Sequence, residues 1–371
     1  MTKLKYLIKM IPLNTYFFGG EKTFTTASGE TNYFARSNQW PQQTTVLGLL
    51  RYLIGKTCGF DPTQIGKHSF IANADDNEFG IITNLSPVFL IDADGNYLLE
   101  AGTDHQKNKK TEKVERFNLK PSDNGPVNFG VYDTAYRGVS DAPNLTFDYK
   151  EYLVSALRNN GNPDSDLVNP EKVFHEHHQV GNKKNYSGGT DEEAFFKQIF
   201  YRLEKNYAFA VIVETSANLP FSVEIETMGA DQSLFRVEAE LLKDEDTVFD
   251  EIEKENLSET GYQRIVLLSD AYVDFPVIEK CNFAVCETND FRNIVTHAID
   301  NGDAKKTRNF HRMKVEHKEP EKVNDTATKS VKFNLLRRGS VLFPDNVQDL
   351  VPHLNNPVFK TIGYNYFQLT K

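Results

Sequence analysis

The sequence has few cysteines and no long apolar run, and each shortage excludes a class of protein. Three cysteines leave one unpaired in any disulfide scheme, and none has CxxC spacing, which favours a reduced, cytoplasmic setting over a secreted one. No apolar segment is long enough to cross a bilayer, so we expect no membrane contact. The lysines near the N-terminus alternate with apolar residues, which predicts a strand and not a signal peptide.

The common catalytic and nucleotide-binding signatures are also missing. GxGxxG, GxxxxGK[ST], GxSxG and HExxH do not occur. The histidine cluster at 175–178 has no cysteine pair or carboxylate motif beside it, and on a strand His175 and His177 would share a face while His178 points away. We therefore predict no cofactor and no metal site, and interpret the cluster as a solvated or RNA-adjacent loop.

Basic residues are fewer than acidic ones, and the two kinds are concentrated in different segments of the chain. The 42 basic and 52 acidic residues give a net charge of −10, which argues against a protein that coats nucleic acid indiscriminately. Residues 231–270 hold twelve acidic and four basic side chains, a net of −8, whereas residues 301–340 hold eleven basic and five acidic ones, a net of +6. Any contact with nucleic acid is therefore expected to be local.

The first half of the 371 residues reads as mixed helix and strand. Alternation over Leu4–Met10 predicts a half-buried strand, and residues 81–100, with a turn at Asp94–Asn96, predict a hairpin. The polar residues 101–146, with six basic and two acidic side chains in 105–120, predict a basic insertion. A helix is expected over 147–158, and the linker-like residues 159–170 are expected to separate a domain 1–160 from a domain 161–371.

The second half is expected to alternate helices and strands in the same way. Phe195, Ile199 and Leu203 recur every four residues, which predicts a helix over 191–205 packed on a strand at 207–214. Further strands are predicted within 221–227, 233–242, 263–273 and 282–288, followed by a short helix over 347–354 and a last strand ending at Leu369. The pattern defines an α+β fold.

The stretch from Pro12 to Gly55 is predicted to be a long loop followed by a helix, and it organises the N-terminal half. Trp40-Pro41 favours an extended backbone just before the helix, and Thr44 or Thr45 can cap the helix. One helix face is apolar, while Gly48 and Arg51 lie on the other, where they could cradle a backbone phosphate. The alternative is that Gly48 permits close packing and Arg51 is a solvated surface charge.

Two basic stretches near the C-terminus combine cationic and aromatic side chains. KKTRNFHRMK (305–314) alternates phosphate-binding with stacking residues, as single-stranded nucleic acid requires, and Arg337-Arg338-Gly339-Ser340 adds a second patch. Both stretches could instead be solvated faces. His68 and His311, each beside a basic residue, are the candidates for acid–base chemistry on RNA.

Several segments together resemble a known family. PLNTYFFGGEKTF, QWPQQTTVLGLLRYLIG, the region from EHHQVG to FAVIVE, MGADQSLFRVEAE and RRGSVLF follow in the order typical of the third subunit of the type III-B (Cmr) CRISPR effector complex, a member of the RAMP superfamily. The resemblance covers most of the chain. It implies two ferredoxin-like (RRM-like) domains without a catalytic centre.

The resemblance also implies a function in antiviral defence. Subunits of this family hold the 5′ repeat-derived tag of the crRNA and dock on the large palm-domain subunit and on the backbone subunits. Two alternatives remain open: an endoribonuclease of the same superfamily that processes precursor crRNA with His68 or His311, and a protein-only interaction subunit. We expect Phe18, Trp40 or Phe310 to stack a base. The residues predicted to grip the tag are Phe18, Lys22, Arg36, Trp40, Thr44, Gly48, Arg51, Arg308, Phe310, His311, Arg312, Arg337, Arg338 and Gly339.

Overall fold

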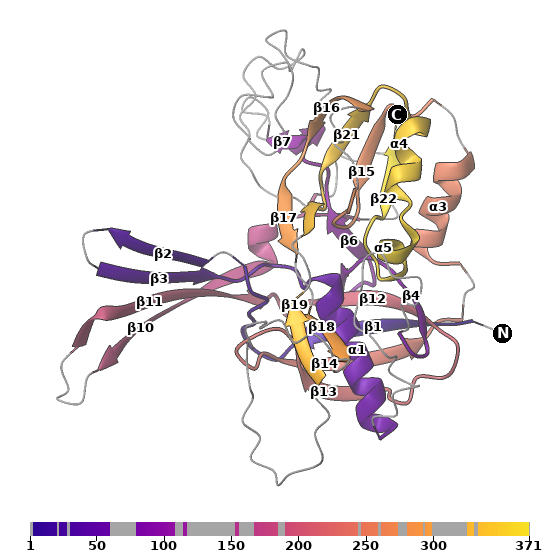
Figure 1. The fold of residues 1–371 in the computed structure, drawn as a ribbon. Coiled ribbons are helices and arrows are strands. Elements are labelled where there is room, and N and C mark those ends of the chain that lie inside the picture. The colour runs from indigo at the N-terminus through magenta and orange to yellow at the C-terminus, as the bar shows by residue number, and fades with distance from the viewer. Residues whose placement is uncertain are drawn as a thin grey trace.

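A computed structural model gives the fold of the chain, and strands dominate it (Figure 1). The predicted α+β class is confirmed in this mixed composition. Among the described helices, none is both long and apolar enough to span a membrane. The structure describes residues 3–20, 22–27, 30–59, 79–107, 114–116, 153–155, 167–184, 190–243, 246–258, 261–273, 280–291, 294–298, 325–329 and 333–370.

The largest sheet has eight strands in the order β13-β14-β1-β12-β5-β6-β9, with β4 pairing β12 off this path. The predicted first strand, β1, lies in its middle and pairs antiparallel with both β12 and β14, so Ile8 is opposite Val211 on one side and Ala239 on the other. The strands are β1 (Leu4–Pro12), β4 (Ile82–Leu85), β5 (Phe89–Asp92), β6 (Tyr97–Glu100), β9 (Leu153–Ser155), β12 (Tyr207–Thr215), β13 (Val223–Thr227) and β14 (Leu234–Leu241).

Both faces of this sheet are covered by a helix. The helix α1 (Gln43–Thr57) packs Leu50 and Leu53 against the face that carries Ile8 and Met10, and all four side chains are fully buried. The helix α3 (Val248–Ser258), which sequence patterns did not predict, places Phe249 and its neighbours on the opposite face. Since β1 alternates between two apolar layers, it is a central strand and not a half-exposed one.

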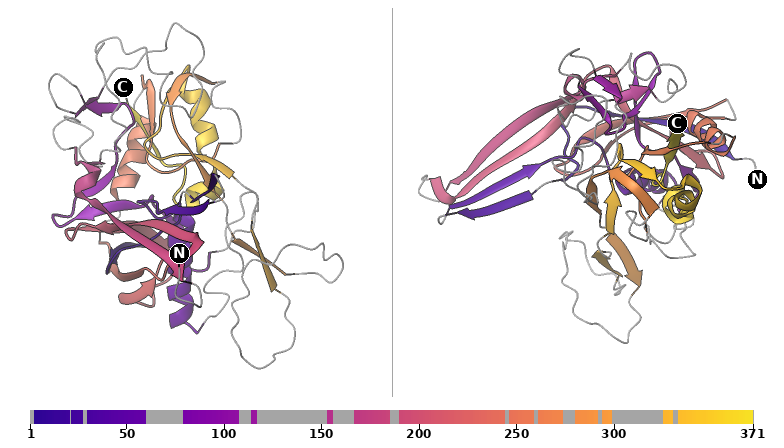
Figure 2. Two further views of the ribbon diagram at one scale, coloured as in Figure 1. Left: turned by 90° about the vertical axis from the view of Figure 1, so that its left-hand side faces the viewer. Right: turned by 90° about the horizontal axis from the view of Figure 1, so that it is seen from above.

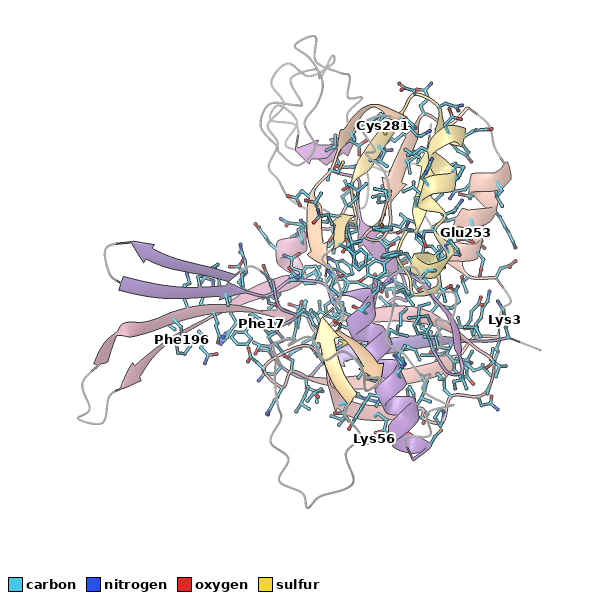
Figure 3. The ribbon with its side chains drawn as sticks, in the orientation of Figure 1. Lys3, Phe17, Lys56, Phe196, Glu253 and Cys281 are labelled. Atoms are coloured by element: carbon cyan, nitrogen blue, oxygen red, sulfur yellow. The ribbon has the colours of Figure 1, made fainter. Side chains whose placement is uncertain are left out.

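A second sheet forms an arm that extends from the body (Figures 1 and 2). Its strand order is β10-β11-β3-β2, and β3 runs parallel to β11 with Tyr33 opposite Phe196. Figure 3 labels Phe17 near the base of the arm and Phe196 further out along it. The arm consists of β2 (Lys22–Ala27), β3 (Glu30–Arg36), β10 (Phe174–Lys184) and β11 (Thr190–Leu203).

The arm corrects two predictions. The stretch expected to be one loop contains the β2–β3 hairpin, and the helix expected over 191–205 is the strand β11. A spacing of four residues puts Ile199 and Leu203 on one face of a helix but equally on one face of a strand, so the pattern could not separate the two. β11 instead pairs with β10 as a hairpin, and its residues 196–199 also pair with β3, 163 residues away in the chain.

The third sheet has the order β16-β21-β15-β22 and is covered by α4 (Val347–Leu354), whose Leu350 and Leu354 pack against Ile265 and Leu342. The predicted helix over 347–354 and the predicted strands around it are confirmed.

The remaining elements are β15 (Arg264–Leu267), β16 (Cys281–Val285), β21 (Val341–Pro344), β22 (Phe367–Thr370), α5 (Pro357–Thr361), η2 (Pro170–Lys172) and the pairs β7 (His105–Lys107) with β8 (Val114–Arg116), β17 (Thr288–Phe291) with β20 (Phe333–Leu336), and β18 (Ile294–Ala298) with β19 (Asp325–Lys329).

Two further local predictions are wrong. Within the expected helix 147–158, the described residues 153–155 form the strand β9, because Leu153 is fully buried against the sheet. The cap of α1 is Gln42 and not a threonine, and it makes no side-chain capping bond. The side chain of Gln43 is instead buried and donates to the carbonyls of Ser86 and Gly363, at 3.0 and 2.7 Å.

The division of the chain at residue 160 stays a prediction, as do the two ferredoxin-like domains. The eight-stranded sheet combines β1, β4, β5, β6 and β9 from before that residue with β12, β13 and β14 from after it. Most of the predicted insertion 101–146 and of the linker 159–170 lies outside the described residues. The sheet order therefore does not itself divide the chain at this point.

Candidate nucleic-acid interface

A polar cleft of about 800 Å³ lies where the base of the arm meets the third sheet. Figure 1 shows β17 reaching down towards the base of the arm. The segment that follows β3 forms one wall, and the turn that follows β20 forms another. The lining residues are Arg36, Ser37, Asn38, Gln39, Trp40, Pro41, Gln42, Glu100, Pro170, Glu171, Phe174, His175, Glu176, Tyr201, Asp270, Asn289, Arg337 and Arg338.

Arg36, the last residue of β3, is held by a carboxylate of the neighbouring hairpin. Its guanidinium forms an ion pair with Glu176 of β10, and its side chain is 43% exposed. Glu176 also accepts a hydrogen bond from His178 Nε2 at 3.0 Å. Burial alone would raise the pKa of Glu176, but His178 and Arg36 hold it below its usual value. Glu176 therefore stays ionised and fixes Arg36 at the rim of the cleft.

The histidine cluster lies on the exposed strand β10 and not in the predicted loop, because β10 pairs with β11 along its length. His175 Nε2 is 2.9 Å from Glu204, while His178 binds Glu176, so the two rings have different carboxylate partners. Among the described residues, no group of three His, Cys, Asp or Glu side chains could hold a metal ion.

Arg337 and Arg338 belong to the tight turn between β20 and β21. Arg337 forms an ion pair with Glu287 at 2.6 Å and is partly exposed. Arg338 is buried, its backbone N–H donates to Asp270 at 2.8 Å and its guanidinium donates to the carbonyl of Val88 at 3.2 Å. Its charge is therefore fixed in the floor of the cleft.

Gly339 completes this turn with φ of +76°, a conformation that suits glycine. A Cβ at this position would lie 3.2 Å from the carbonyl oxygen of Ala101, which leaves little room for a side chain. The predicted close approach at Gly339 is thus made by the protein's own backbone, and Thr103 N–H donates to the Gly339 carbonyl at 2.8 Å.

Two of the aromatic rings predicted to stack a base belong to the hydrophobic core. Trp40 is 6% exposed, packs edge-on against Phe174 and Phe209, and has the Arg338 guanidinium 4.8 Å from its ring centroid. Phe18 stacks on Phe235 with centroids 5.8 Å apart. Trp40 is thus enclosed by core neighbours, whereas Phe18 is only partly buried and packs against the same core, so that it stacks a base stays a prediction. The third ring, Phe310, lies outside the described residues.

The cleft brings together four of the predicted tag-binding residues: Arg36, Trp40, Arg337 and Arg338. They come from segments about 300 residues apart in the chain, so the expected convergence of these segments is present in the fold. Arg308, His311 and Arg312, like Phe310 and His68, lie outside the described residues. Lys22 begins β2 of the arm, and its side chain is not described.

The predicted phosphate-binding face of α1 does not line the cleft. Thr44 lies beside the hydroxyl of Tyr364. Gly48 is exposed, and burial lowers the pKa of Arg51 from its usual value. That this face binds a phosphate stays a prediction, which Gly48→Leu and Arg51→Ala would test by tag affinity across a salt titration.

Gly48→Ala should raise the stability of the protein. Gly48 is exposed in the middle of α1, and a Cβ there meets no atom within 4 Å, so the close packing considered for this glycine does not occur. Alanine lowers the entropy of the unfolded chain and favours the helix, worth about 0.5–1 kcal/mol. Urea unfolding would measure the change, and a lower midpoint than wild type would contradict it.

Sequence patterns missed the carboxylates that hold the arginines. Glu176 was seen only as part of a histidine cluster, Asp270 only as part of an acidic segment and Glu287 only as part of a predicted strand, although each binds an arginine of the cleft. Tyr201 was also missed, because it was expected on a helix. A carboxylate partner more than a hundred residues away, as Glu176 is from Arg36, leaves no local signal.

The fold and the cleft define a strand-rich α+β protein with a polar, arginine-lined binding cleft. The family model described as CRISPR-associated protein (Cas_Cmr3) matches residues 8–369. The chain belongs to this family, so the family predicted from the sequence is confirmed.

Two solved structures contain chains to which this chain is similar. The chain is similar to one in the cryo-EM structure of the type III-B Cmr-beta bound to cognate target RNA, with 11% identity, a TM-score of 0.48 and coverage of 99% of both chains. It is also similar to one in Cmr-beta bound to cognate target RNA and AMPPnP, with 11% identity, a TM-score of 0.45 and coverage of 97% of this chain and 94% of that one. No curated protein matches the sequence.

Proposed function

We propose that this chain is a non-catalytic subunit of a type III-B CRISPR effector complex, which holds the 5′ repeat-derived tag of the crRNA and docks the large palm-domain subunit onto the backbone subunits in antiviral defence. Membership of the Cas_Cmr3 family supports the complex. The observation that carries the RNA-binding part is the convergence of Arg36, Arg337 and Arg338 on one cleft.

The arginines of the cleft have graded roles in this proposal. Arg36 and Arg337 are partly exposed, so their guanidinium groups can reach phosphate oxygens of an unpaired strand. Arg338 is buried and supplies positive potential from beneath. Asn38, Gln39 and Asn289 carry amides that can bind base edges as the strand crosses the cleft.

The carboxylates of the cleft make binding selective. Glu176, Glu287 and Asp270 each interact with one of the three arginines, so a phosphate must compete with a carboxylate already in place. Single, scattered phosphates would gain little from this exchange. A strand that engages Arg36 and Arg337 at once gains both contacts together, which agrees with an acidic protein that binds RNA only locally.

A binding titration with a synthetic RNA that carries the repeat-derived tag tests this function. The purified chain should bind the tag more tightly than a scrambled RNA of equal length, and the affinity should fall as salt rises. The same RNA incubated with the protein in EDTA should stay intact. Defined cleavage that His311→Ala abolishes would instead support the ribonuclease, and binding to neither RNA would favour the protein-only alternative.

Glu176→Gln should strengthen tag binding. The change keeps the size of the side chain but removes the negative charge that competes for Arg36. Because a charge-assisted bond is roughly twice as strong as a neutral one, the phosphate should displace the amide more easily, by about three- to tenfold in Kd. Filter binding or fluorescence anisotropy measures the change.

Glu204→Gln is the matched control for this prediction. Its carboxylate pairs with His175 at 2.9 Å and holds no arginine of the cleft, so tag affinity should stay at the wild-type value. If Glu176→Gln binds more weakly than wild type, Glu176 acts by positioning Arg36, and competition is not its role.

A further inference from the structure

The strand β13 is an open edge of the largest sheet. It is the first strand in the sheet order, and within the described part of the chain only β14 pairs with it. Figure 1 shows it as the outermost of the strands that follow β12, β1 and β14 downwards. Exposed edges are usually short, charged or covered, because their free backbone groups can pair with another chain.

The hydrogen-bond ladder shows which backbone groups point to this edge. Ala239 N–H donates to the carbonyl of Ser222 at 2.8 Å, and Met228 N–H donates to that of Ser233 at 2.9 Å. Bonded positions alternate along an antiparallel pair, so positions 222, 224, 226 and 228 face β14. The N–H and C=O groups of Val223 and Ile225 therefore face outwards.

The side chains of the same two residues are exposed and apolar. Val223 is 51% exposed and Ile225 is 56% exposed. Leu234 of β14 and Leu13, whose N–H donates to the Leu234 carbonyl at 2.9 Å, continue the apolar strip at 47% and 49% exposure. On the same face, Glu238 and Arg236 of β14 are opposite Val223 and Ile225 and form an ion pair, so the apolar side chains follow the edge strand itself and are bordered inwards by charge. Apolar side chains grouped at an edge mark an interaction surface more often than scattered single residues do.

The opposite face of β13 is acidic. Glu224 and Glu226 point towards the end of α1, where they share the ammonium of Lys56 at 3.3 and 3.2 Å, and Figure 3 labels Lys56 at that end of the helix. Two carboxylates with one cation leave a negative surplus. The segment 231–270, which continues from β13, carries a net charge of −8.

We propose that β13 is a docking edge for a partner protein, which adds an extended segment of alternating apolar and basic residues as the next strand of the sheet. The apolar side chains of that segment would cover Val223 and Ile225, and its basic ones would face Glu224 and Glu226. A second copy of the chain is a poor occupant, because edge-to-edge pairing would bring these carboxylates together. The proposal does not rest on RNA binding by the cleft.

A labelled peptide of alternating lysine and valine is the probe, with a block isomer of the same composition as the control for charge alone. We expect the full-length chain to bind the alternating peptide saturably and at least tenfold more tightly than the block isomer. Ile225→Pro should weaken this binding at least tenfold, because it removes an N–H that faces the edge and leaves the bonds to β14 in place. Ile225→Thr, which keeps the N–H, should weaken it less.

A change in the peptide gives the same test without changing the protein. N-methylation of alternate residues blocks pairing on one side of the peptide, so the form with its pairing side blocked should bind at least tenfold more weakly. Replacing the lysines by glutamates should have a similar effect. Equal binding of the alternating and block peptides, no saturable binding, or β13-dependent dimers of the chain would each overturn the proposal.

Discussion

Arg36→Ala should weaken binding of the crRNA tag by about 1–2 kcal/mol, or roughly five- to thirtyfold, at moderate salt. Arg36 is the more exposed of the two rim arginines of the cleft, and its loss removes a planar donor suited to phosphate. The slope of log affinity against log salt should also become shallower by about 0.7, as expected for one phosphate contact on a single strand. Anisotropy titrations at several salt concentrations give both values.

Arg236→Ala is the control for this prediction, since Arg236 is also an exposed arginine paired with a glutamate, Glu238, at 2.7 Å, but it does not line the cleft. It should bind the tag like wild type. Arg36→Lys keeps the charge without the planar fork and should fall between wild type and Arg36→Ala. If Arg36→Ala and Arg236→Ala lower the affinity equally, the cleft has no specific role and the effect is one of net charge.

Asp104→Ala should destabilise the fold by about 3–5 kcal/mol. Asp104 is fully buried, and its carboxylate lies 2.7 Å from Arg264 of β15, which is also buried. Arg264 donates to Thr370 at 3.0 Å as well, so the pair links the segment after β6 to the third sheet. Without Asp104 the guanidinium would be left as an unpaired buried charge. The midpoint of urea unfolding should fall accordingly.

The double variant Asp104→Ala with Arg264→Met separates the unpaired charge from lost packing. With both charges removed it should be more stable than Asp104→Ala alone, since no buried ion lacks a partner. If the double variant is the less stable of the two, the unpaired guanidinium does not cause the loss, and Arg264 stabilises the fold through its other contacts, such as that with Thr370.

The same pair predicts how stability depends on pH. Burial alone would raise the pKa of Asp104, but Arg264 and His105 lower it to about 2. A carboxyl group with a depressed pKa stabilises the folded state above its unfolded pKa of about 4, and this contribution is lost as pH falls from there towards 2. The difference between wild type and Asp104→Ala should therefore shrink over that pH range.

The sequence predicts a strand or a helix best where the spacing of its apolar residues fits the period of one of the two and not of both. In the first strand Leu4, Tyr6, Ile8 and Met10 recur every second residue, the period of a strand, and β1 forms where expected. The spacing of Ile199 and Leu203 fits both periods, and pairing with β10, and with β3 at Ile199, makes this segment a strand. The helix α3 was missed because its apolar face is short and its charge is high.

In the candidate site, too, some features can be predicted from the sequence and others cannot. Basic side chains close together in sequence, such as Arg337 and Arg338, can be found from the chain alone. Their burial cannot, since it depends on Asp270, Val88 and Trp40, which reach Arg338 through the fold. Trp40 illustrates the limit, because an aromatic residue within a polar segment fits equally a stacking platform or a place in the core.

The central place of β1 in its sheet has a consequence for synthesis of the protein. Its pairing partners end at Thr215 and Leu241, so about 230 residues must be added after Pro12 before both edges of β1 are covered. At roughly 5–20 residues per second this takes on the order of 10–45 s. An apolar strand with both edges open for that time is a target for chaperones and a hazard for aggregation. The yield of soluble protein should therefore depend strongly on translation speed and temperature, even if the finished fold is stable.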